Sequence, residues 1–485
     1  MPHAVTQSCV GDGSCVYACP VNCIQPTPDD PAFELAEMLF IDPATCVDCG
    51  ACLTACPVDA IKPARDLEPS EVAFLEINAA YHEARDARRK RPSLAPVPPR
   101  LRVRDFGPGS ALDVAIVGSG PAAMYAADEL LTIPGARVTV YERLDRPYGL
   151  VRSGVAPDHR RTRRVTRQLD RIREHPRLSM RLGVEIGRDL THEQLMERHH
   201  GVIYAIGALS DRRLQIPGAE LPGVASATEF VGWYNGHPDY ADRAFDLSHR
   251  RAIVVGNGNV ALDVARILTV DPESLVDTEI APHALAALRA SKVEEVVVVG
   301  RRGPEHSSFT LPELIGLSAT EGVTLAVDPA DLPAEIPHGD AKLELLQGLA
   351  SRPRLGRTIH LRYGLTPVAI HGFQEVDGLE LQPTFDASTR ATTLGAGLVL
   401  TAIGYRGLAV PGVPFDEVTG TVPNDAGRVC DPQGGAPVAG TYVTGWIKRG
   451  PTGFIGTNKR CAQETVRTLV DDHNAGLLRT AAATT

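Results

Sequence analysis

The stretch Leu-Asp-Val-Ala-Ile-Val-Gly-Ser-Gly-Pro-Ala-Ala at residues 112–123 sets the fold class of the larger part of this chain. An apolar run of strand type leads into the turn Gly118-x-Gly120-x-x-Ala123 and then into a helical sequence. The glycines permit a tight turn with close backbone approach, and the N-terminus of the following helix favours a pyrophosphate. The stretch therefore predicts an α/β dinucleotide-binding domain that begins near residue 111.

Glu142 indicates which nucleotide this first turn prefers. It closes the next strand-like run, Arg-Val-Thr-Val-Tyr-Glu at 137–142. An acid in this place bonds a ribose diol and repels a 2′-phosphate, so the site suits FAD or NAD rather than NADP. The alternative is a solvated strand end, which the neighbouring turn and helix make the weaker interpretation.

A second turn of the same kind lies in Ala-Ile-Val-Val-Gly-Asn-Gly-Asn-Val-Ala at 252–261, with Gly256 and Gly258 at the glycine positions. Its following strand, at 293–300, ends in Arg301 and Arg302 instead of an acid. Two guanidinium groups can hold a 2′-phosphate through paired charge-assisted hydrogen bonds, which selects NADPH over NADH. The alternative is a surface arginine pair that serves solubility.

The cysteines indicate a second kind of chemistry. Eight of the ten lie before residue 57, in two runs of nearly equal spacing. The second run is Cys46-x2-Cys49-x2-Cys52-x3-Cys56-Pro57, and the first is Cys9-x2-Asp12-x2-Cys15-x3-Cys19-Pro20. Such a run is the iron–sulfur ligand pattern of two-cluster bacterial ferredoxins, so the head of the chain is expected to carry single electrons.

In the two-cluster arrangement the fourth cysteine of each run crosses to the other cluster. One [4Fe–4S] cluster is therefore expected on Cys46, Cys49, Cys52 and Cys19. The other cluster is expected on Cys9, Cys15 and Cys56, with Asp12 as the remaining group. Zinc knuckles are the alternative, but a zinc site uses two ligand pairs rather than runs that end in proline.

Asp12 leaves two possibilities open for the second cluster. As a ligand it would place a hard carboxylate oxygen on one iron among soft sulfides, which is a weak and exchangeable bond. If Asp12 is not a ligand, the corner of the cluster nearest to it holds no iron. The cluster is then [3Fe–4S], which is the state that we favour. Cys23 is expected not to be a ligand, because Ala60 occupies its place in the internal repeat.

Charge and composition exclude some classes of protein. The net charge is −10, and 43% of the 485 residues are hydrophobic, with no apolar stretch long enough for a membrane span. Residues 1–61 hold acids and no Lys or Arg, whereas basic residues gather between 85 and 104. This asymmetry favours electrostatic docking between proteins rather than nucleic-acid binding. The first residues do not form a secretory signal, and cluster-type cysteines belong to a reducing compartment, so we expect a cytoplasmic protein.

From Leu112 onward the chain resembles the adrenodoxin reductase type of ferredoxin–NADP reductase. The matching segments are Gly-Ser-Gly-Pro-Ala-Ala at 118–123, Tyr-Gly-Leu-Val-Arg-Ser-Gly-Val-Ala-Pro-Asp-His at 148–159, Gly-Asn-Gly-Asn-Val-Ala-Leu-Asp-Val-Ala-Arg at 256–266, Arg-Arg-Gly-Pro at 301–304, and Gly-Trp-Ile-Lys-Arg-Gly-Pro-Thr-Gly-Phe-Ile-Gly-Thr-Asn at 445–458. The head resembles seven-iron ferredoxins, and the fusion is similar to the mycobacterial ferredoxin reductase B type. The resemblance implies an α+β two-cluster ferredoxin head followed by an α/β two-domain Rossmann-like flavoprotein of the glutathione reductase kind.

The resemblance also implies site residues. Those for FAD are Ala122, Glu142, Leu150, Val184, Trp446, Gly453, Phe454 and Ile455. Those for NADP are Asn257, Gly258, Asn259, Val260, Arg301, Arg302, Glu313 and Gly453. His159 and Glu313 match residues that the family places near the nicotinamide, as catalytic candidates; the alternative is positioning or loop structure, since hydride transfer needs no obligatory acid or base.

The expected organisation is a ferredoxin-like domain at 1–66, a linker at 67–110, an FAD-binding domain at 111–208 and 403–475, an NADP-binding domain at 209–402, and a flexible tail at 476–485. The resemblance implies that the NADP domain is inserted, with crossovers near Gly207 and Gly404. Seven arginines are expected to lie along one helix and to form a docking face for a ferredoxin, internal or external; the alternative is a solvated basic helix face. They are Arg160, Arg161, Arg163, Arg164, Arg167, Arg171 and Arg173.

The expected activity is NADPH:ferredoxin oxidoreduction, with hydride transfer from NADPH to FAD and single electrons passing through the clusters to a ferredoxin or a cytochrome P450. A disulfide reductase is rejected, because no cysteine lies between Cys56 and Cys430. The alternatives that stay open are an electron-delivering subunit of a larger flavoenzyme, similar to the glutamate synthase small subunit, and a non-enzymatic carrier.

Overall fold

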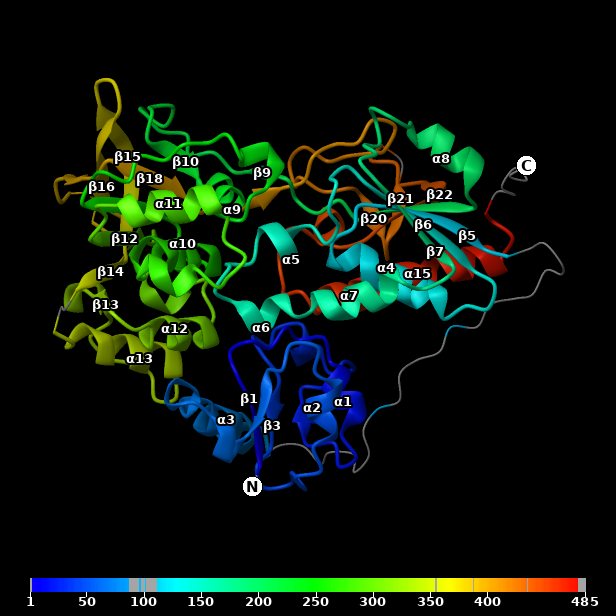
Figure 1. Ribbon diagram of the computed structural model, residues 1–485, viewed down its shortest axis with the longest axis horizontal. Coiled ribbons are helices and arrows are strands. Elements are labelled where there is room, and N and C mark those ends of the chain that lie inside the picture. Colours follow the sequence, from blue (N-terminus) through cyan, green and yellow to red (C-terminus); the bar gives the residue numbers. More distant parts are fainter. Residues whose placement is uncertain are drawn as a thin grey trace.

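The computed structural model describes residues 2–86, 96, 101, 111–353, 356–386, 388–433 and 435–478. Two α/β domains lie side by side, and a small head formed by the first residues lies beneath both of them (Figure 1). Among the residues that the structure describes, none of the helices is long and apolar enough to span a membrane.

The head is built from two related halves. In each half a glycine with φ of +73° precedes a short helix, Gly13 before α1 and Gly50 before α2. Two antiparallel strand pairs, β1 with β4 and β2 with β3, complete the unit. The head elements are β1 (His3–Val5), α1 (Ser14–Ala18), β2 (Ile24–Gln25), β3 (Phe40–Ile41), α2 (Ala51–Ala55) and β4 (Ile61–Pro63).

The segment expected as a linker begins with a helix, α3 (Ala73–Asp86), that packs on the head. Phe74 and Asn78 are buried, and the Asn78 side chain bonds the backbone of Val5 and Ile41. The structure therefore differs from the expected start of the linker at 67, because an apolar and amide face of α3 completes the head. Most of the basic Pro-rich stretch that follows, and most of the tail at 476–485, lie outside the described residues.

One α/β domain, which we call the outer domain, is the domain that contains α4 to α8, α14 and α15. It carries a seven-stranded sheet in the order β20-β21-β22-β8-β5-β6-β7. Strands β22, β8, β5, β6 and β7 are parallel, and β20 and β21 are added antiparallel. Helices α4, α7 and α15 cover one face of the sheet, and α8 covers the other. The strands are β5 (Asp113–Val117), β6 (Arg137–Glu142), β7 (Leu178–Leu182), β8 (Gly201–Tyr204), β20 (Asn424–Asp425), β21 (Arg428–Cys430) and β22 (Pro437–Val443). The helices are α4 (Pro121–Leu131), α5 (Leu150–Ser153), α6 (Arg160–Arg163), α7 (Thr166–Arg173), α8 (His192–Arg198), α14 (Trp446–Arg449) and α15 (Thr457–Asn474).

The inserted α/β domain carries a six-stranded parallel sheet in the order β10-β18-β11-β12-β14-β13. Its central strands are buried on both faces, which explains runs such as Glu-Val-Val-Val-Val in β12. Helices pack on one face, and an antiparallel sheet, β15-β16-β17, packs on the other. The strands are β10 (Val224–Ser226), β11 (Arg251–Val255), β12 (Glu295–Val299), β13 (Val323–Val327), β14 (Arg357–Arg362), β15 (Leu365–Gly372), β16 (Val376–Pro383), β17 (Thr392–Gly395) and β18 (Leu398–Thr401). The helices are α9 (Ala227–Tyr234), α10 (Asn259–Thr269), α11 (Pro282–Ala290), α12 (Leu311–Ser318) and α13 (Ala341–Ala350).

The chain passes between the two α/β domains at one place. Strand β9 (Ser210–Asp211) leaves the outer domain, and β19 (Tyr405–Arg406) returns to it as its antiparallel partner. The Arg212 amide also donates to the Gly404 carbonyl at 3.0 Å. The two crossing segments are therefore held together at the junction of the domains.

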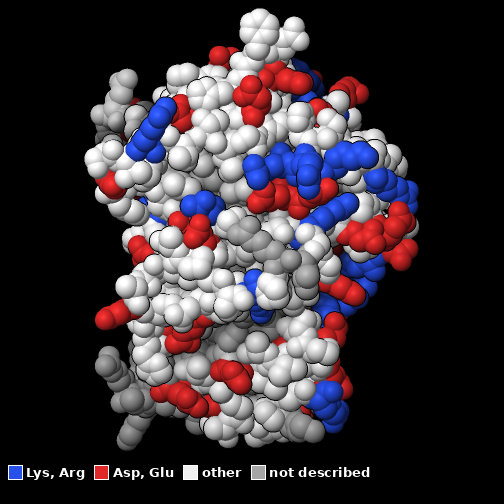
Figure 2. Space-filling model, turned by 90° about the vertical axis from the view of Figure 1, so that its left-hand side faces the viewer, with Lys and Arg blue, Asp and Glu red and all other residues white. Residues whose placement is uncertain are grey.

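The head contacts both α/β domains. Val10, Val58 and Ala60 join the apolar core of the outer domain, whereas Ile315 of the inserted domain joins the core of the head. Some surface charges of the inserted domain are paired across neighbouring strands, as in Arg251–Glu295 at 2.6 Å. On the face shown in Figure 2, basic side chains lie in rows beside acidic ones rather than in separate fields.

Candidate redox site

The first glycine turn has the geometry that a dinucleotide needs. Gly118 has φ of +98°, and a Cβ there would lie 2.5 Å from the Ala205 carbonyl oxygen, so a larger residue is excluded. A Cβ on Gly120 would meet nothing within 4 Å, so the turn is open on that side. α4 begins directly after Gly120, and its first turn faces this open space. The turn therefore fits a bound pyrophosphate.

The Glu142 carboxylate is buried beside this turn. Its Oε2 accepts from the Ser119 amide at 3.0 Å and from the Ser119 hydroxyl at 2.6 Å, and its Oε1 accepts from the Leu144 amide at 2.9 Å. A carboxylate offers about four acceptor positions, so one position remains for a ribose hydroxyl. The carboxylate thus both holds the turn and remains able to bind a ligand.

Further segments lie around this turn and around Glu142. A Cβ on Gly149, next to Leu150, would lie 3.5 Å from the Gly120 Cα, and one on Gly445, next to Trp446, would lie 2.6 Å from the Ala122 Cβ. The Val184 amide donates to the Glu142 carbonyl at 2.9 Å. The loop 453–455 is tied down by Asn458, whose amide donates to the carbonyls of Phe454 and Ile455 at 3.1 Å. The structure therefore brings the residues expected for FAD to one edge of the outer sheet.

The second glycine turn lies at the matching edge of the inserted sheet. Gly256 has φ of +117°, and a Cβ there would collide with the Ala402 carbonyl. A Cβ on Gly258 would meet nothing within 4 Å. The Asn259 side chain accepts from the Thr310 amide at 2.9 Å, which links the turn to the start of α12. Val260 stands one residue further, in the first turn of α10.

Arg301 and Arg302 lie just beyond β12, beside this turn. Gly300 precedes them, and a Cβ there would lie 2.8 Å from the Asn257 side-chain nitrogen. Both arginine side chains are exposed, and among the described residues neither has an ion-pair partner. Two free guanidinium groups next to an open glycine turn fit a 2′-phosphate.

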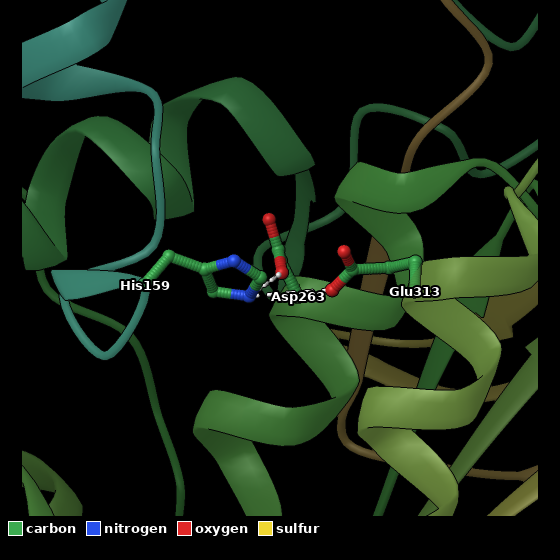
Figure 3. Close-up of side chains that lie close together, drawn as sticks. All are labelled: His159, Asp263 and Glu313. Atoms are coloured by element: carbon green, nitrogen blue, oxygen red, sulfur yellow. Dashed lines mark ion pairs between the residues drawn. The ribbon is translucent and has the colours of Figure 1, made fainter. Parts of the chain in front are cut away.

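His159 joins the two α/β domains through acids of the inserted domain. Its Nε2 lies 3.2 Å from Asp263 Oδ1 and 3.2 Å from Glu313 Oε1. Figure 3 shows the imidazole reaching from its loop toward the two carboxylates, which come from different helices. The expected catalytic pair is thus in direct contact.

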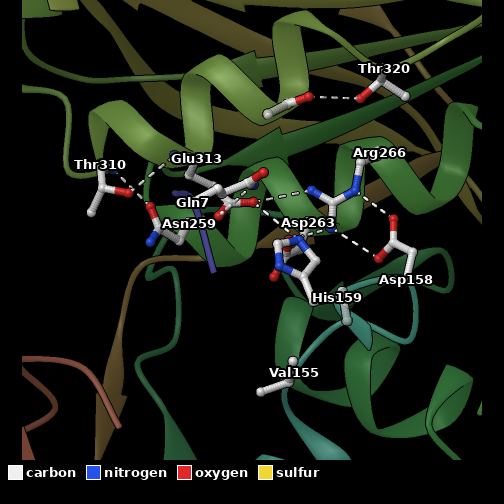
Figure 4. Close-up of polar contacts among 12 residues, drawn as sticks. Gln7, Val155, Asp158, His159, Asn259, Asp263, Arg266, Thr310, Glu313 and Thr320 are labelled. Carbon is white, nitrogen blue, oxygen red and sulfur yellow. Dashed lines mark hydrogen bonds and ion pairs between the residues drawn. The ribbon is translucent and has the colours of Figure 1, made fainter. Parts of the chain in front are cut away.

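Arg266 is the centre of this group. Its guanidinium contacts Asp158 at 2.7 Å, Asp263 at 2.7 Å and Glu313 at 3.2 Å. Figure 4 shows Arg266 between Asp158 and Glu313, with Gln7 of the head beside Glu313. The Gln7 amide donates to Glu313 Oε2 at 3.4 Å. His159, Asp263 and Glu313 have the composition of a metal site, but Arg266 already supplies a cation to both carboxylates.

The charges in this group are mutually stabilised. Burial opposes the charged form of His159, but Glu313 and Asp263 outweigh it and raise the pKa of His159 to about 10. Burial acts against ionisation of Glu313 too, but His159 and Arg266 lower the pKa of Glu313 to about 2. Both groups are therefore charged at neutral pH, and neither is free to exchange a proton with a substrate there.

The two thiol sets of the head lie where the crossed pattern predicts. One cavity is lined by Cys19, Cys46, Cys49 and Cys52, together with Cys23, whose Sγ lies 3.4 Å from that of Cys19. Cys9, Cys15 and Cys56 are close enough to influence one another, and burial raises the pKa of Cys9 to about 12, with Cys56 and Asp12 adding to the rise. Buried thiols of this kind become thiolates when a metal binds. Both sets therefore fit iron–sulfur clusters.

The two thiol sets differ in their distance from the outer domain. Cys9 and Cys56 pack against the apolar core of the outer domain, and Ile455 packs against the same core, whereas Cys49 is exposed to solvent. The Gly456 amide donates to the Val10 carbonyl at 2.7 Å. The set with Asp12 thus adjoins the loop expected at FAD, and the all-cysteine set lies toward solvent.

The arginine face was predicted as one helix, but the structure has two, α6 and α7, that break after Arg163. Arg161 bonds Glu68 at 2.9 Å and Glu71 at 2.6 Å, and Arg164 pairs with Asp59, so both meet the head. The prediction was wrong for Arg163, which is buried between Glu279, Asn235 and the Val155 carbonyl. A buried guanidinium cannot contribute to a surface patch.

Three cations at the site were not predicted. Arg266 ends the segment 256–266 and Lys459 directly follows the segment 445–458, but their partners Asp158 and Asp12 are far away in sequence. Arg449 is half-buried, and its Nε and Nη1 have no hydrogen-bond partner among the described residues. Such donors next to the 453–455 loop fit an anionic ligand. The Arg-Gly-Pro run at 449–451 is the signal that could have identified Arg449.

Comparison with known proteins agrees with this geometry. Family models match residues 8–60, as a 4Fe-4S dicluster domain, and residues 112–301, as a pyridine nucleotide-disulphide oxidoreductase. A probable ferredoxin/ferredoxin–NADP reductase of Mycobacterium tuberculosis is 55% identical over 500 aligned residues, covering 100% of this chain and 86% of the relative. The NADPH-ferredoxin reductase FprA of the same organism is 45% identical over 385 residues, covering 74% of this chain and 83% of the relative.

The solved structures point the same way. FprA of Mycobacterium tuberculosis in complex with NADPH is 42% identical, with a TM-score of 0.71, and the match covers 77% of this chain and 87% of that one. These similarities favour FAD, NADP and iron–sulfur groups as the cofactors of this fold, and they give no support to a subunit of a larger flavoenzyme. The chain belongs to the ferredoxin/ferredoxin–NADP reductase family, in which a two-cluster ferredoxin head precedes a two-domain flavoprotein reductase.

Proposed function

We propose that this chain oxidises NADPH and delivers single electrons through its own head to an external protein, such as a ferredoxin or a cytochrome P450. When bound, FAD supplies the change from hydride to single-electron chemistry, and iron–sulfur clusters supply one-electron transport. Three features of the structure support the proposal: the two glycine turns, the histidine that bridges the α/β domains, and the two thiol sets of the head.

The turn at Gly118 and the carboxylate of Glu142 would hold FAD, with Leu150, Val184, Trp446 and the 453–455 loop around the flavin. The turn at Gly256 and the pair Arg301 and Arg302 would hold NADPH. The open side of each turn and the absence of ion-pair partners at both arginines, among the described residues, support these assignments.

We assign His159 and Glu313 a positioning role. Their mutual charge stabilisation leaves no exchangeable proton at neutral pH, and hydride transfer requires none. Instead, the pair fixes the loop before α6 to α12 and so sets how closely the two nucleotides approach. Misplacement of reacting groups by even a small distance slows transfer strongly.

For the head we propose a [4Fe–4S] cluster on Cys19, Cys46, Cys49 and Cys52, and a [3Fe–4S] cluster on Cys9, Cys15 and Cys56. Asp12 is the group that admits a fourth iron. One observation carries the relay: Cys9 and Cys56 of the thiol set with Asp12 pack on the outer-domain core against which Ile455 also packs, while Cys49 is exposed to solvent. The acceptor would then meet the head on the side of Cys49. Cysteines in cluster spacing fit a reducing compartment, so we propose a cytoplasmic location.

Disrupting the all-cysteine thiol set of the head, in the full-length chain, tests the relay. The double variant Cys46→Ala with Cys49→Ala should keep NADPH-dependent reduction of a small dye and lose at least about 90% of transfer to a large one-electron protein. Cys430→Ala, a half-buried cysteine of the outer domain, is the matched control and should retain both activities. Full transfer by the double variant to the large protein would refute the relay.

A further inference from the structure

Asp12 is held by a lysine that belongs to the reductase rather than to the head. The Lys459 ammonium, in the first turn of α15, lies 3.8 Å from Asp12 Oδ2 and bonds the Ser14 hydroxyl at 3.1 Å. Ser14 in turn donates to the Asp12 carboxylate. Asp12 is 9% exposed, so these contacts lie in a partly desolvated place.

The same carboxylate lies on the loop between Cys9 and Cys15. Burial raises the pKa of Cys9, Cys15 and Cys56, the three cysteines of this ligand set, and the charge of Asp12 adds to the rise in each of them. Asp12 thus lies between the corner where a fourth iron would bind and a cation from the other domain. A carboxylate bound to an ammonium and a hydroxyl must give up part of that contact before it can coordinate iron.

The contact is fixed by the way the head is seated. The Gly456 amide bonds the Val10 carbonyl at 2.7 Å, and a Cβ on Gly456 would collide with the backbone of Gly11 and Asp12. The Asp12 loop therefore lies directly on the start of α15, where the positive end of the helix dipole adds to the charge of Lys459. A divalent cation that binds at this corner is therefore repelled by the Lys459 ammonium and by the positive end of the α15 dipole.

We propose that Lys459 controls the iron content of the head by disfavouring the capture of Fe2+ at Asp12. The inference rests on the ligand sets proposed above. Capture adds one Fe2+ to the one-electron-reduced three-iron cluster, [3Fe–4S]0 + Fe2+ = [4Fe–4S]2+, so that no further electron is needed. The Asp12 oxygen forms the new bond to iron, and its contact with Lys459 is broken.

An anaerobic iron titration of the full-length chain tests the proposal. The protein is reduced with dithionite, incubated with increasing Fe2+, reoxidised, and examined by electron paramagnetic resonance for oxidised three-iron signal per flavin. Lys459→Gln should lose the signal at an Fe2+ concentration at least about tenfold lower than the unmodified chain, since one partly screened charge is removed from beside a divalent ion. Lys459→Arg keeps the charge and should behave as the unmodified chain.

Arg460 provides the matched control. It is the next residue of α15 and also reaches the head, at 3.5 Å from Glu34, but it does not contact Asp12. Arg460→Gln should leave the titration unchanged. The proposal is overturned if Lys459→Gln titrates as the unmodified chain, if Arg460→Gln shifts equally, or if the unmodified chain is isolated with four irons at this site. Because dithionite supplies the electrons, failure of NADPH to reduce the head would contradict the proposed function without changing these readings.

Discussion

His159 Nε2 lies 3.2 Å from Glu313 Oε1, and this contact ties a loop of the outer domain to a helix of the inserted domain. Arg266 touches the same carboxylate, and Gln7 brings the head to it. All three parts of the chain therefore meet at one buried acid. These contacts link the two Rossmann-like domains and the ferredoxin head to one another at a single side chain.

The His159–Glu313 pair should make stability depend on pH. The folded-state pKa of His159 is raised to about 10 from 6.5, so its contribution is full below about pH 6.5 and is lost as the pH rises toward 10. The pKa of Glu313 is lowered, so its contribution is full above about pH 4.5 and is lost as the pH falls toward 2. The free energy of unfolding of the unmodified chain should exceed that of His159→Gln most between pH 5 and 6.5.

Denaturant unfolding at pH 6 and pH 10 measures this difference. His371→Gln is the matched control, because His371 also contacts a glutamate, Glu380 at 3.0 Å, but lies on the surface. That control should change stability by less than about 0.5 kcal/mol at either pH. An equal loss for His159→Gln at pH 6 and pH 10 would contradict the assigned charges.

Replacing both Arg301 and Arg302 with alanine should raise KM for NADPH by about 10- to 100-fold and leave kcat nearly unchanged. The reason is that the 2′-phosphate loses its charge-assisted hydrogen bonds while the nicotinamide contacts remain. KM for NADH should not change. Arg250→Ala, which removes an arginine already paired with Glu294, is the control, and steady-state kinetics with both nucleotides gives the comparison.

Gly118→Ala should abolish flavin binding and destabilise the fold by roughly 2–4 kcal/mol, because positive φ and a collision with the Ala205 carbonyl act together. Gly322→Ala separates the two causes. Gly322 also has positive φ, +73°, but its Cβ would meet nothing within 4 Å, so the cost should stay near 1 kcal/mol with full flavin content. Flavin absorbance per chain and the thermal midpoint decide between these outcomes.

Gly456→Ala should lift the head from the reductase, because the new methyl group would enter the space of the Gly11 and Asp12 backbone. Amide hydrogen exchange in segments 8–16 and 453–460 should then rise by at least about tenfold. Gly348→Ala, in helix α13 where a Cβ meets nothing within 4 Å, should leave that exchange unchanged. Unchanged protection in Gly456→Ala would mean that the head is not seated on α15.

Local patterns in the sequence were sufficient for the strands, the glycine turns and the crossed thiol sets. A Gly-x-Gly turn after an apolar run has one common structural solution, and both turns of this chain adopt it. Contacts between distant segments could not be predicted in this way. Arg163 looked like one more arginine of an exposed face, yet Glu279 and Asn235, which bury it, lie in the other domain.

Helix α3 and Lys459 show the same limit. The amphipathic face of α3 is short and precedes a basic Pro-rich stretch, so the sequence predicts a linker for the whole segment. Only the structure shows that the Asn78 side chain accepts from the backbone amides of Val5 and Ile41. Lys459 directly follows the segment 445–458, and only the seating of the head reveals that it reaches Asp12. In both cases the partner of the residue depends on how separate units pack.

The central claim is that electrons from NADPH reach the head of the same chain. Rapid freeze-quench electron paramagnetic resonance after anaerobic mixing with NADPH measures this directly. The measurement is repeated over a range of about a hundredfold in the concentration of the chain. Intramolecular transfer is first order, so the account predicts one rate constant for reduction of the head at every concentration. A rate that rises in proportion to chain concentration, or a head that stays oxidised while the flavin is reduced, would contradict it.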